Sequence, residues 1–405
     1  MEQSESPFDS FRVIIKLLTI TGFYEIESSR KYVRAIHQAY RIFVIFIMLA
    51  FAIQHYIYTF QVADQDDKLY GLIIGSPQIN FMVKILTVHF KYGRIRELHV
   101  LIKDPIFSST NKKDLEYIQR NNVAMQMLGK SIYYCMTVAA VTLTLVFIFK
   151  RIEDPVNASV PSYVPFDTTS TIGYSISVCL EVTTIFWIGF GQSAADCAVA
   201  CYYSQARTQL KIIKYNLEHI FDNEDEESIL MEHDTSSNVR PKYIDEVNGN
   251  IKTKFISFIE RYKMVDWYVT EISSIFDTSI TCQLISSTLA TCLVSYMLSL
   301  LEIFSVMFLH LLVCLVYFKM QAFIYCFFGQ LVEDESKSIN DAMYFSDWLS
   351  VSPRFRRYII ISMTRWTKPL TPRVSTIVPI NFVTFASIVN SSYRLYTFMK
   401  SSHIA

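Results

Sequence analysis

The chain has 405 residues, of which 51% are apolar and 18% charged, whereas an average soluble domain has about 25% charged residues. Lys+Arg and Asp+Glu each number 37, so the chain offers no net basic field for holding nucleic acid. This composition excludes a nucleic-acid partner and a typical soluble domain, and it predicts an all-α membrane protein.

The first segment, residues 1–41, lacks the order of residues found in a secretory signal. Acidic residues come first, and Lys16 interrupts the apolar stretch that follows. We therefore expect this segment to stay in the cytosol.

Charge-poor stretches long enough to cross a membrane recur along the chain, since a crossing helix needs about 20 largely apolar residues. These stretches are 42–60, 69–90, 131–149, 171–203, 276–332 and 374–399. The fifth is too long for one crossing, because its part 278–318 alone would form a helix of about 60 Å, twice the bilayer thickness. Glu302 is the only charge in that part. It predicts a turn between two helices, 276–299 and 303–331, and seven spans in total.

Lysine and arginine are distributed unevenly among the connecting segments. The segments before span one and after spans two, four and six contain 30 of them, and the remaining connections and the C-terminal end contain 5. Positive residues stay on the cytosolic side, so the N-terminus is predicted inside and the C-terminus outside. A glycosylation sequon at Asn157 falls in a predicted outer loop.

The spans and charges together predict six parts of the chain. They are a cytosolic segment (1–41), spans one to four (42–205), a cytosolic helical extension with a mobile insert (206–271), spans five and six (272–332), cytosolic anchor helices (333–373), and span seven with a short extracellular C-terminus (374–405). The insert is predicted from an acidic run at 222–227 and a polar stretch at 234–238.

Other classes of seven-helix or membrane protein fit less well. A G-protein-coupled receptor has its N-terminus outside, and the sequence Phe149-Lys150-Arg151 closes span three in place of an Asp-Arg-Tyr-like triplet. No convergent catalytic set and no metal-ligand spacing occurs, so we expect no enzyme, cofactor or metal. A polytopic transporter or acyltransferase remains the alternative from another class, and an inverted repeat would favour it.

Short segments near the C-terminus share their order with a known family. They are AMYFSDW at 342–348, MTR at 363–365, KPL at 368–370 and TFASIVNSSY at 384–393. This order resembles the C-terminal signature of insect odorant receptors. The related gustatory receptors have the same architecture but typically show Thr-Tyr followed five residues later by Gln-Phe in span seven, and that pair is absent here.

The resemblance implies a ligand-gated, non-selective cation channel. In that family four subunits surround one pore lined by the seventh helices, and a variable odorant-binding subunit assembles with a common co-receptor. This chain is similar to a variable subunit, because its second cytosolic segment is shorter than that of the co-receptor. The implied partners are a co-receptor in a heterotetramer, a small neutral volatile odorant, membrane lipid and permeant cations. The implied location is the plasma membrane of a sensory dendrite.

Span seven is unusually polar for a helix that faces lipid. The polar residues that interrupt it are Ser375, Thr376, Asn381, Thr384, Ser387, Asn390, Ser391, Ser392 and Thr397. Such residues indicate either a pore wall or close helix packing, and the resemblance favours the pore. The pore and gate residues that it implies are Asn390, Arg394, Thr397, Phe398, Ser401 and Ser402. Phe398 would form the apolar constriction, where the family more often has a smaller aliphatic residue, and such a ring closes by dewetting.

The resemblance also implies an apolar odorant pocket in the outer half of the membrane, among spans two, three, four and six. On span three, Tyr133, Thr137, Ala140 and Thr144 follow helical spacing and predict one polar-tipped face. The residues expected to complete the pocket are Gln78, Ile79, Met82, Tyr174, Cys179, Val182, Phe186, Phe304, Phe308 and Leu311. The alternative for each is packing within the bundle. The lack of a charged pair in this set favours a neutral ligand.

Three ionisable residues, Lys84, Glu181 and Lys319, were identified within the spans. We expect both lysines to extend to water at the inner membrane surface, and Glu181 to make a structural hydrogen bond. In the predicted cytosolic anchor, the resemblance implies that Tyr344 and Trp348 contact a neighbouring subunit. The alternative is an amphipathic helix on the membrane surface.

Overall fold

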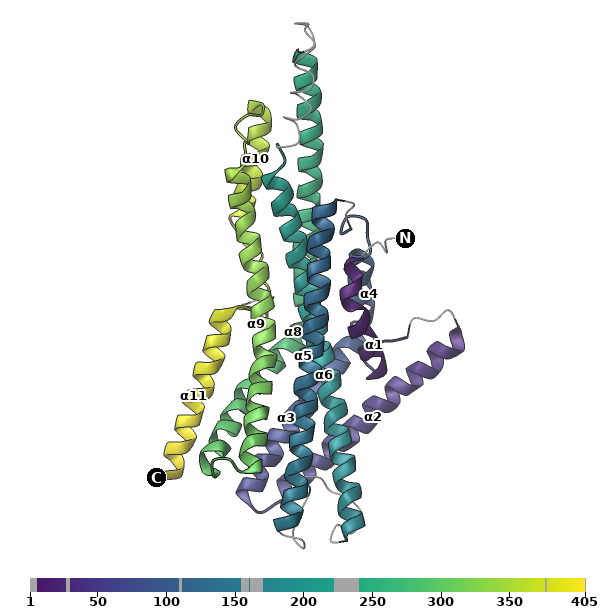
Figure 1. Cartoon of the computed structure of the whole chain (residues 1–405), viewed down its shortest axis with the longest axis vertical. Coiled ribbons are helices and arrows are strands. Elements are labelled where there is room, and N and C mark those ends of the chain that lie inside the picture. The colour runs from purple at the N-terminus through teal and green to yellow at the C-terminus, as the bar shows by residue number, and fades with distance from the viewer. Residues whose placement is uncertain are drawn as a thin grey trace.

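The computed structural model describes residues 6–26, 30–108, 111–153, 160, 170–221, 240–375 and 377–404, without the side chains of 66, 240–250 and 402–404. Most helices run along the long axis of the molecule, α2 crosses obliquely and projects to one side, and α11 stands at one edge (Figure 1). The predicted insert within 206–271 and Asn157 lie outside the described residues.

The elements follow one another along the chain in a simple order. They are η1 (Pro7–Phe11), α1 (Arg12–Ile20), α2 (Lys31–Gln61), α3 (Gln65–Phe90), α4 (Tyr92–Ile102), α5 (Lys112–Glu153), α6 (Thr171–Glu218), α8 (Arg240–Leu300), α9 (Val306–Phe345), α10 (Pro353–Trp366), β1 (Arg373–Val374), β2 (Val378–Pro379) and α11 (Phe382–Ile404). The prediction of an all-α fold is confirmed, with one short antiparallel hairpin in which Val374 pairs with Val378.

Within the described residues, six helices are long and apolar enough to cross a membrane: α2, α3, α5, α6, α8 and α9. α11 has 23 residues and is not among them, because Asn390, Arg394 and several hydroxyl side chains lower its hydropathy. On α2, large apolar side chains such as Phe43, Phe46 and Phe60 are exposed. Apolar surface of this kind is typical of a helix that faces lipid.

The connection between α8 and α9 lies where the sequence predicted a turn. α8 ends at Leu300 and α9 begins at Val306, on either side of Glu302. The Ser305 side chain accepts a hydrogen bond of 3.1 Å from the Phe308 amide, which satisfies one of the free N–H groups of the first turn. The backbone of Phe304 adopts a positive φ of 72° in this turn.

The predicted start of span seven at Val374 is wrong. Arg373–Val374 and Val378–Pro379 form the two strands of the β1–β2 hairpin, and α11 begins only at Phe382. Pro379 has no N–H group to donate within a helix. The side chain of Asn381 then accepts a bond of 3.2 Å from the Thr384 amide and so caps the new helix.

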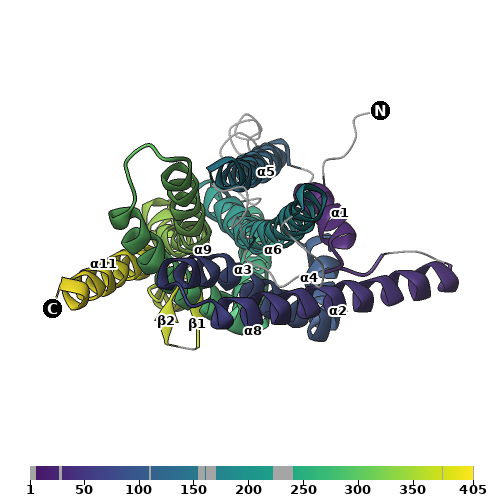
Figure 2. The same cartoon turned by 90° about the horizontal axis from the view of Figure 1, so that it is seen from below.

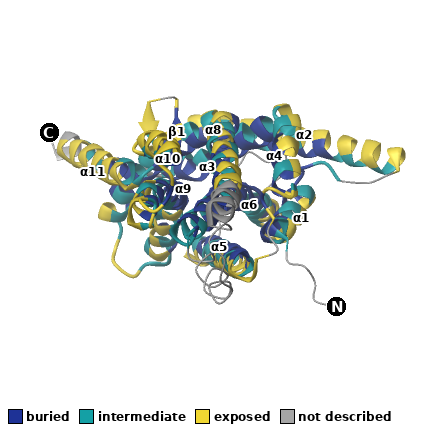
Figure 3. Cartoon of the chain, turned by 90° about the horizontal axis from the view of Figure 1, so that it is seen from above, coloured by how far each residue is buried: buried dark blue, intermediate teal, exposed yellow. Residues whose placement is uncertain are grey.

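The core has two parts, and α6 is central to the larger one. Residues 191–206 of α6 are buried on all sides, and Figure 2 shows this helix among α3, α5, α8 and α9. Small residues permit the close packing, because a Cβ atom at Gly191 would meet the rings of Phe81 and Phe23. Buried residues concentrate on these central helices, whereas α11 and the projecting end of α2 are mostly exposed (Figure 3).

Candidate ligand pocket and pore helix

The smaller part of the core joins five of the long helices near their lower ends in Figure 1. We call it the lower cluster. Its buried members are Tyr70, Ile73, Ile74, Leu143, Phe147, Val160, Tyr174, Ala290, Val294, Met297, Leu311 and Phe318. The cluster is almost entirely aliphatic and aromatic, which is the usual composition of a small-molecule pocket wall.

A few polar groups lie within or beside this apolar wall. His310 of α9 is buried, and its Nδ1 lies 3.1 Å from the Thr142 hydroxyl of α5. The ring of Tyr70 meets the His310 ring edge to face, with centroids 6.4 Å apart. The Tyr70 hydroxyl is buried and has no hydrogen-bond partner among the described residues. Few, oriented polar groups in an apolar site are the features that select one small molecule over another.

A cavity of about 590 Å³ opens beside the lower cluster. Tyr70 and Phe147 belong to both, and the exposed ring of Phe304 lies at the cavity, on the α8–α9 turn. Lys150 Nζ lies 3.3 Å from Asp67 Oδ1 at the same end. The volume is in the range of pockets that hold small organic molecules.

The predicted pocket residues fall into separate groups. Tyr174 and Leu311 belong to the lower cluster, and Val182 packs against it. Tyr133 and Phe186 form an aromatic group around Phe190, at centroid distances of 4.7 and 4.1 Å. The lower cluster and this aromatic group are therefore the two places to which the structure brings predicted residues.

Other predicted residues are placed differently. Met82 packs against the larger part of the core, whereas Ala140 and Phe308 are half-buried. Gln78 is only 2% exposed, and neither atom of its amide has a hydrogen-bond partner among the described residues. Thr144 donates to the carbonyl of Ala140 on its own helix.

Three predicted residues face outward. Ile79 is exposed because it lies one helical step of about 100° from the buried Gln78. Thr137 and Cys179 are also exposed, and the Thr137 hydroxyl donates to the Tyr133 carbonyl. In the structure of the single chain these side chains do not reach the lower cluster.

Sequence reasoning missed the polar groups that the fold brings to the lower cluster. His310 was not among the residues expected to line the pocket, although the α5–α9 packing pairs it with Thr142. Glu181 of α6 was identified from the sequence, but its neighbour His55 of α2 was not: His55 Nδ1 lies 3.8 Å from Glu181 Oε1, and both side chains are fully buried. The only feature of the sequence that indicates such a group is a polar residue within an apolar stretch. That feature does not identify the residue with which it pairs.

The expectation that Lys84 extends to water is wrong. Its side chain is 2% exposed, and Nζ lies 2.6 Å from Oδ1 of Asp196, which is 1% exposed. Asp196 lies within predicted span four but was not among the ionisable residues identified from the sequence. Lys319 is half-buried, and its Nζ lies 3.5 Å from the Ser392 hydroxyl of α11.

α11 has one face against the bundle and one face open. On the packed face, Ser392 donates to the Thr288 carbonyl of α8 at 3.3 Å, and the ring of Phe385 meets that of Phe323 at 5.4 Å. The predicted pore residues Asn390, Arg394, Thr397, Phe398 and Ser401 are all exposed. Their spacing of three and four residues places them along one side of the helix. The side chain of Ser402 lies outside the described residues.

The predicted anchor residues differ in their surroundings. Tyr344 is exposed, with Phe345 and Leu349 exposed beside it. Trp348 instead packs against the core of its own chain. An apolar surface therefore remains at the end of α9, and Tyr344 contributes more to it than Trp348.

The fold and these sites define a multi-pass helical membrane protein with an apolar cluster and a small-molecule-sized cavity between its helices. The family model for the 7tm odorant receptor matches residues 68–393. The chain belongs to this family, so the resemblance seen in the sequence is confirmed. Membership in a receptor family places the chain outside the enzymes.

Curated relatives match over part of their length. Odorant receptor 19a of Drosophila melanogaster is 29% identical over 123 residues, 30% of this chain and 32% of the relative. Odorant receptor 10 of Aedes albopictus is 23% identical over 156 residues, 38% and 40% of the two chains. The odorant receptor coreceptor of Aedes aegypti is 25% identical over 134 residues, which are 33% of this chain and 28% of the relative. The matches thus span between about a quarter and two fifths of these relatives.

The fold is similar to that of a solved receptor over nearly the whole chain. The olfactory receptor OR5 of Machilis hrabei, solved in complex with eugenol, superposes with a TM-score of 0.80 at 14% identity, covering 97% of each chain. A second structure of the same receptor gives a TM-score of 0.79 at 15% identity, covering 96% of this chain and 97% of that one. At this identity the similarity concerns the fold.

Proposed function

We propose that this chain is the odorant-sensing subunit of a ligand-gated, non-selective cation channel in the plasma membrane. A small neutral volatile binds between the long helices, and α11 lines the pore. The partner is a co-receptor subunit, in keeping with the sequence similarity to the coreceptor of Aedes aegypti. The N-terminus is cytosolic and the C-terminus extracellular.

The observation that carries the ligand-binding part is the cavity beside the lower cluster. Its lining includes the rings of Tyr70, Phe147 and Phe304 together with the charged side chains of Asp67, Lys150, Glu153 and Glu302. The buried His310 meets the Tyr70 ring edge to face. Apolar walls suit the body of a volatile molecule, and one or two hydrogen-bonding groups suit its oxygen function. In the proposed orientation this cavity is at the outer surface, where an odorant arrives.

Support for the pore comes from the open face of α11. This face combines hydroxyl and amide side chains with the exposed ring of Phe398. A face of this composition is poorly suited to lipid, but it suits a water-filled channel closed by an apolar ring. Four copies of α11 around an axis would bring these faces together.

Gating follows from differential binding. A ligand opens the channel only to the extent that it binds the open state more tightly than the closed state. The lower cluster joins α3, α5, α6, α8 and α9, and α11 packs on α8 and α9. A ligand that shifts α9 relative to α8 would therefore act directly on the helices that hold α11.

The test is membrane current in cells expressing this chain with and without an insect odorant co-receptor, challenged with volatile esters, alcohols and aldehydes. We expect a rapid, non-selective cation current that requires both subunits and one class of volatile. A slow response that depends on G proteins, or no response from protein verified at the cell surface, would contradict the proposal.

A further inference from the structure

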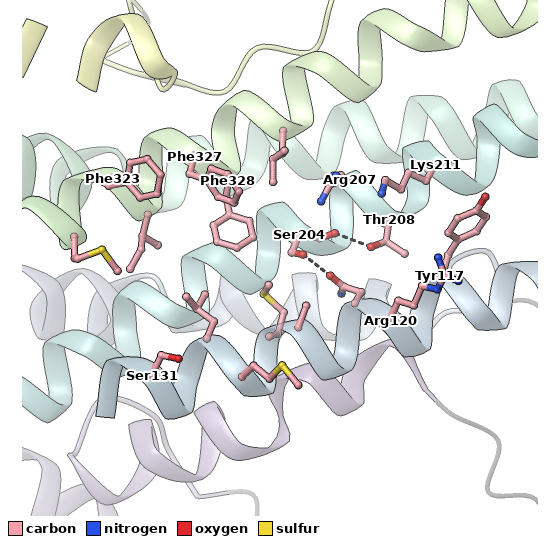
Figure 4. Close-up of a pocket in the computed structure, with 18 residues that line it drawn as sticks. Tyr117, Arg120, Ser131, Ser204, Arg207, Thr208, Lys211, Phe323, Phe327 and Phe328 are labelled. Atoms are coloured by element: carbon pink, nitrogen blue, oxygen red, sulfur yellow. Dashed lines mark hydrogen bonds between the residues drawn. The ribbon is translucent and has the colours of Figure 1, made fainter. Parts of the chain in front are cut away.

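A second cavity, of about 550 Å³, lies between α5, α6 and α9 at a distance from the lower cluster. Figure 4 shows its two ends. Arg120, Arg207 and Lys211 lie at one end, and the rings of Phe323 and Phe327 lie at the other. The cavity is therefore amphipathic along its length.

The charged end has more cations than its neighbouring carboxylates neutralise. Arg120 pairs with Glu116 at 2.6 Å on its own helix, and Arg207 Nε lies 3.7 Å from Glu335 Oε2. Lys211 forms no hydrogen bond or close ion pair within the described part of the chain. Partial burial lowers the pKa of Lys211, and the charge of Arg207 lowers it further. An anion bound here would relieve this repulsion.

The position of the cavity fits the membrane surface. Arg120 is eleven residues before Ser131, where span three is predicted to begin, and both line the cavity. That separation is about 16 Å along a helix. Arg207 and Lys211 follow the predicted end of span four at residue 203, whereas Phe323 lies within predicted span six. Four residues of helix measure about 6 Å, so Arg207 lies in the cytosolic headgroup layer, which is about 5–7 Å thick, and Arg120 and Lys211 lie beyond it toward the cytosol. The apolar end lies at the depth of acyl chains.

We propose that this cavity binds an anionic phospholipid of the cytosolic leaflet. Arg120, Arg207 and Lys211 hold the phosphate and headgroup charge, and an acyl chain lies along Phe323 and Phe327. The cytosolic leaflet is the source of anionic lipid at this depth. The apolar half of the cavity favours a lipid over a free phosphate ion, which would leave that half without contacts. The proposal uses the orientation given above but does not require channel activity.

The experiment uses the purified full-length chain in detergent, with short-chain phosphatidylserine as the probe and native mass spectrometry as the readout. Short-chain phosphatidylcholine and inorganic phosphate are measured in parallel. We expect phosphatidylserine to bind, phosphatidylcholine to bind at least tenfold more weakly, and phosphate to compete poorly. Equal binding of the two lipids would overturn the requirement for an anion, and full competition by phosphate would overturn the requirement for a lipid.

Variants locate the site. Lys211→Gln should weaken phosphatidylserine binding about tenfold or more, as expected for loss of one charge-assisted contact. Lys211→Arg should retain binding, and Lys263→Gln, which removes an exposed cation of α8 outside the cavity, should leave it unchanged. Ala124→Trp, which fills the cavity without changing charge, should also weaken binding. Unchanged binding in both Lys211→Gln and Ala124→Trp would place the lipid elsewhere and overturn the proposal.

Discussion

The ammonium group of Lys84 on α3 lies 2.6 Å from the carboxylate of Asp196 on α6, within the buried interior of the bundle. The same carboxylate accepts a hydrogen bond of 3.0 Å from Gln321 Nε2 and one from the Tyr325 hydroxyl, both on α9. One buried anion therefore joins three of the long helices. A charge pair persists at such a site only when both partners are present and hydrogen-bonded.

Lys84→Met should destabilise the protein strongly, by about 3–5 kcal/mol, because it leaves Asp196 buried without its counter-charge. Lys84→Met combined with Asp196→Asn should recover much of this loss, since the amide needs no counter-charge. Lys319→Met is the control, because Lys319 is half-buried and makes only a 3.5 Å contact with Ser392. Melting temperature in detergent provides the measurement, and an unchanged value for Lys84→Met would refute the structural role.

Gly329 on α9 permits the close approach of the chain that leads into α11. A Cβ atom there would overlap the carbonyl oxygen of Ile380. Gly329→Ala should therefore displace the start of α11 or cost about 1–3 kcal/mol through overpacking, and it should reduce odorant-evoked current. Gly129→Ala on α5 is the matched control, because a Cβ atom there meets nothing within 4 Å. Equal currents in the two variants at equal surface expression would contradict this prediction.

His99 on α4 should make stability depend on pH in the acidic range. Burial, with a smaller effect from the charge of Lys103, lowers the pKa of His99 to about 4. The unfolded chain, with a histidine pKa near ~6.5, binds the proton first as pH falls. The neutral His99 side chain therefore contributes its full stabilisation of the folded state above pH ~6.5. This stabilisation is lost as the pH falls from ~6.5 to ~4, and it amounts to roughly 3 kcal/mol at most.

The measurement is the difference in melting temperature between neutral and mildly acidic buffer. His99→Gln should show a smaller difference than the natural chain, and an equal difference in the two would contradict this prediction. His99 also lies 2.6 Å from the Tyr202 hydroxyl, so the variant will be less stable at neutral pH. The change in melting temperature with pH decides the outcome, and the melting temperature at a single pH does not.

Thr142→Val should alter ligand potency by removing the hydroxyl that lies 3.1 Å from His310 Nδ1. Loss of one hydrogen bond to a buried ring should change the free energy of ligand binding by about 1 kcal/mol, which corresponds to roughly fivefold in potency. Thr137→Val, one and a half turns away on the same helix, is the control, because that residue is exposed and bonds only to its own helix. If the dose–response curves shift equally in both variants, the contact between Thr142 and His310 has no specific role in ligand binding.

The helices were largely predictable because apolar stretches of crossing length are a local property of the sequence. The turn at Glu302 was predictable for the same reason. The partner of Lys84 was not, since Asp196 is 112 residues away and only the packing of α3 on α6 brings them together. The start of α11 was predicted too early because hydropathy does not distinguish a helix from a strand. Val374 and Val378 pair in a hairpin before the helix begins. The polar side of the lower cluster was missed because it depends on contacts between helices.

The central claim is that α11 lines a pore opened by an odorant, and thiol modification tests it most directly. Asn390→Cys places a thiol on the open face of α11, and Ile388→Cys places one on the face buried in the bundle. With the co-receptor present, a charged thiol reagent should reduce the odorant-evoked current of Asn390→Cys but not that of Ile388→Cys or the natural chain. Insensitivity of Asn390→Cys, or equal sensitivity of both variants, would contradict the assignment of α11 as the pore helix.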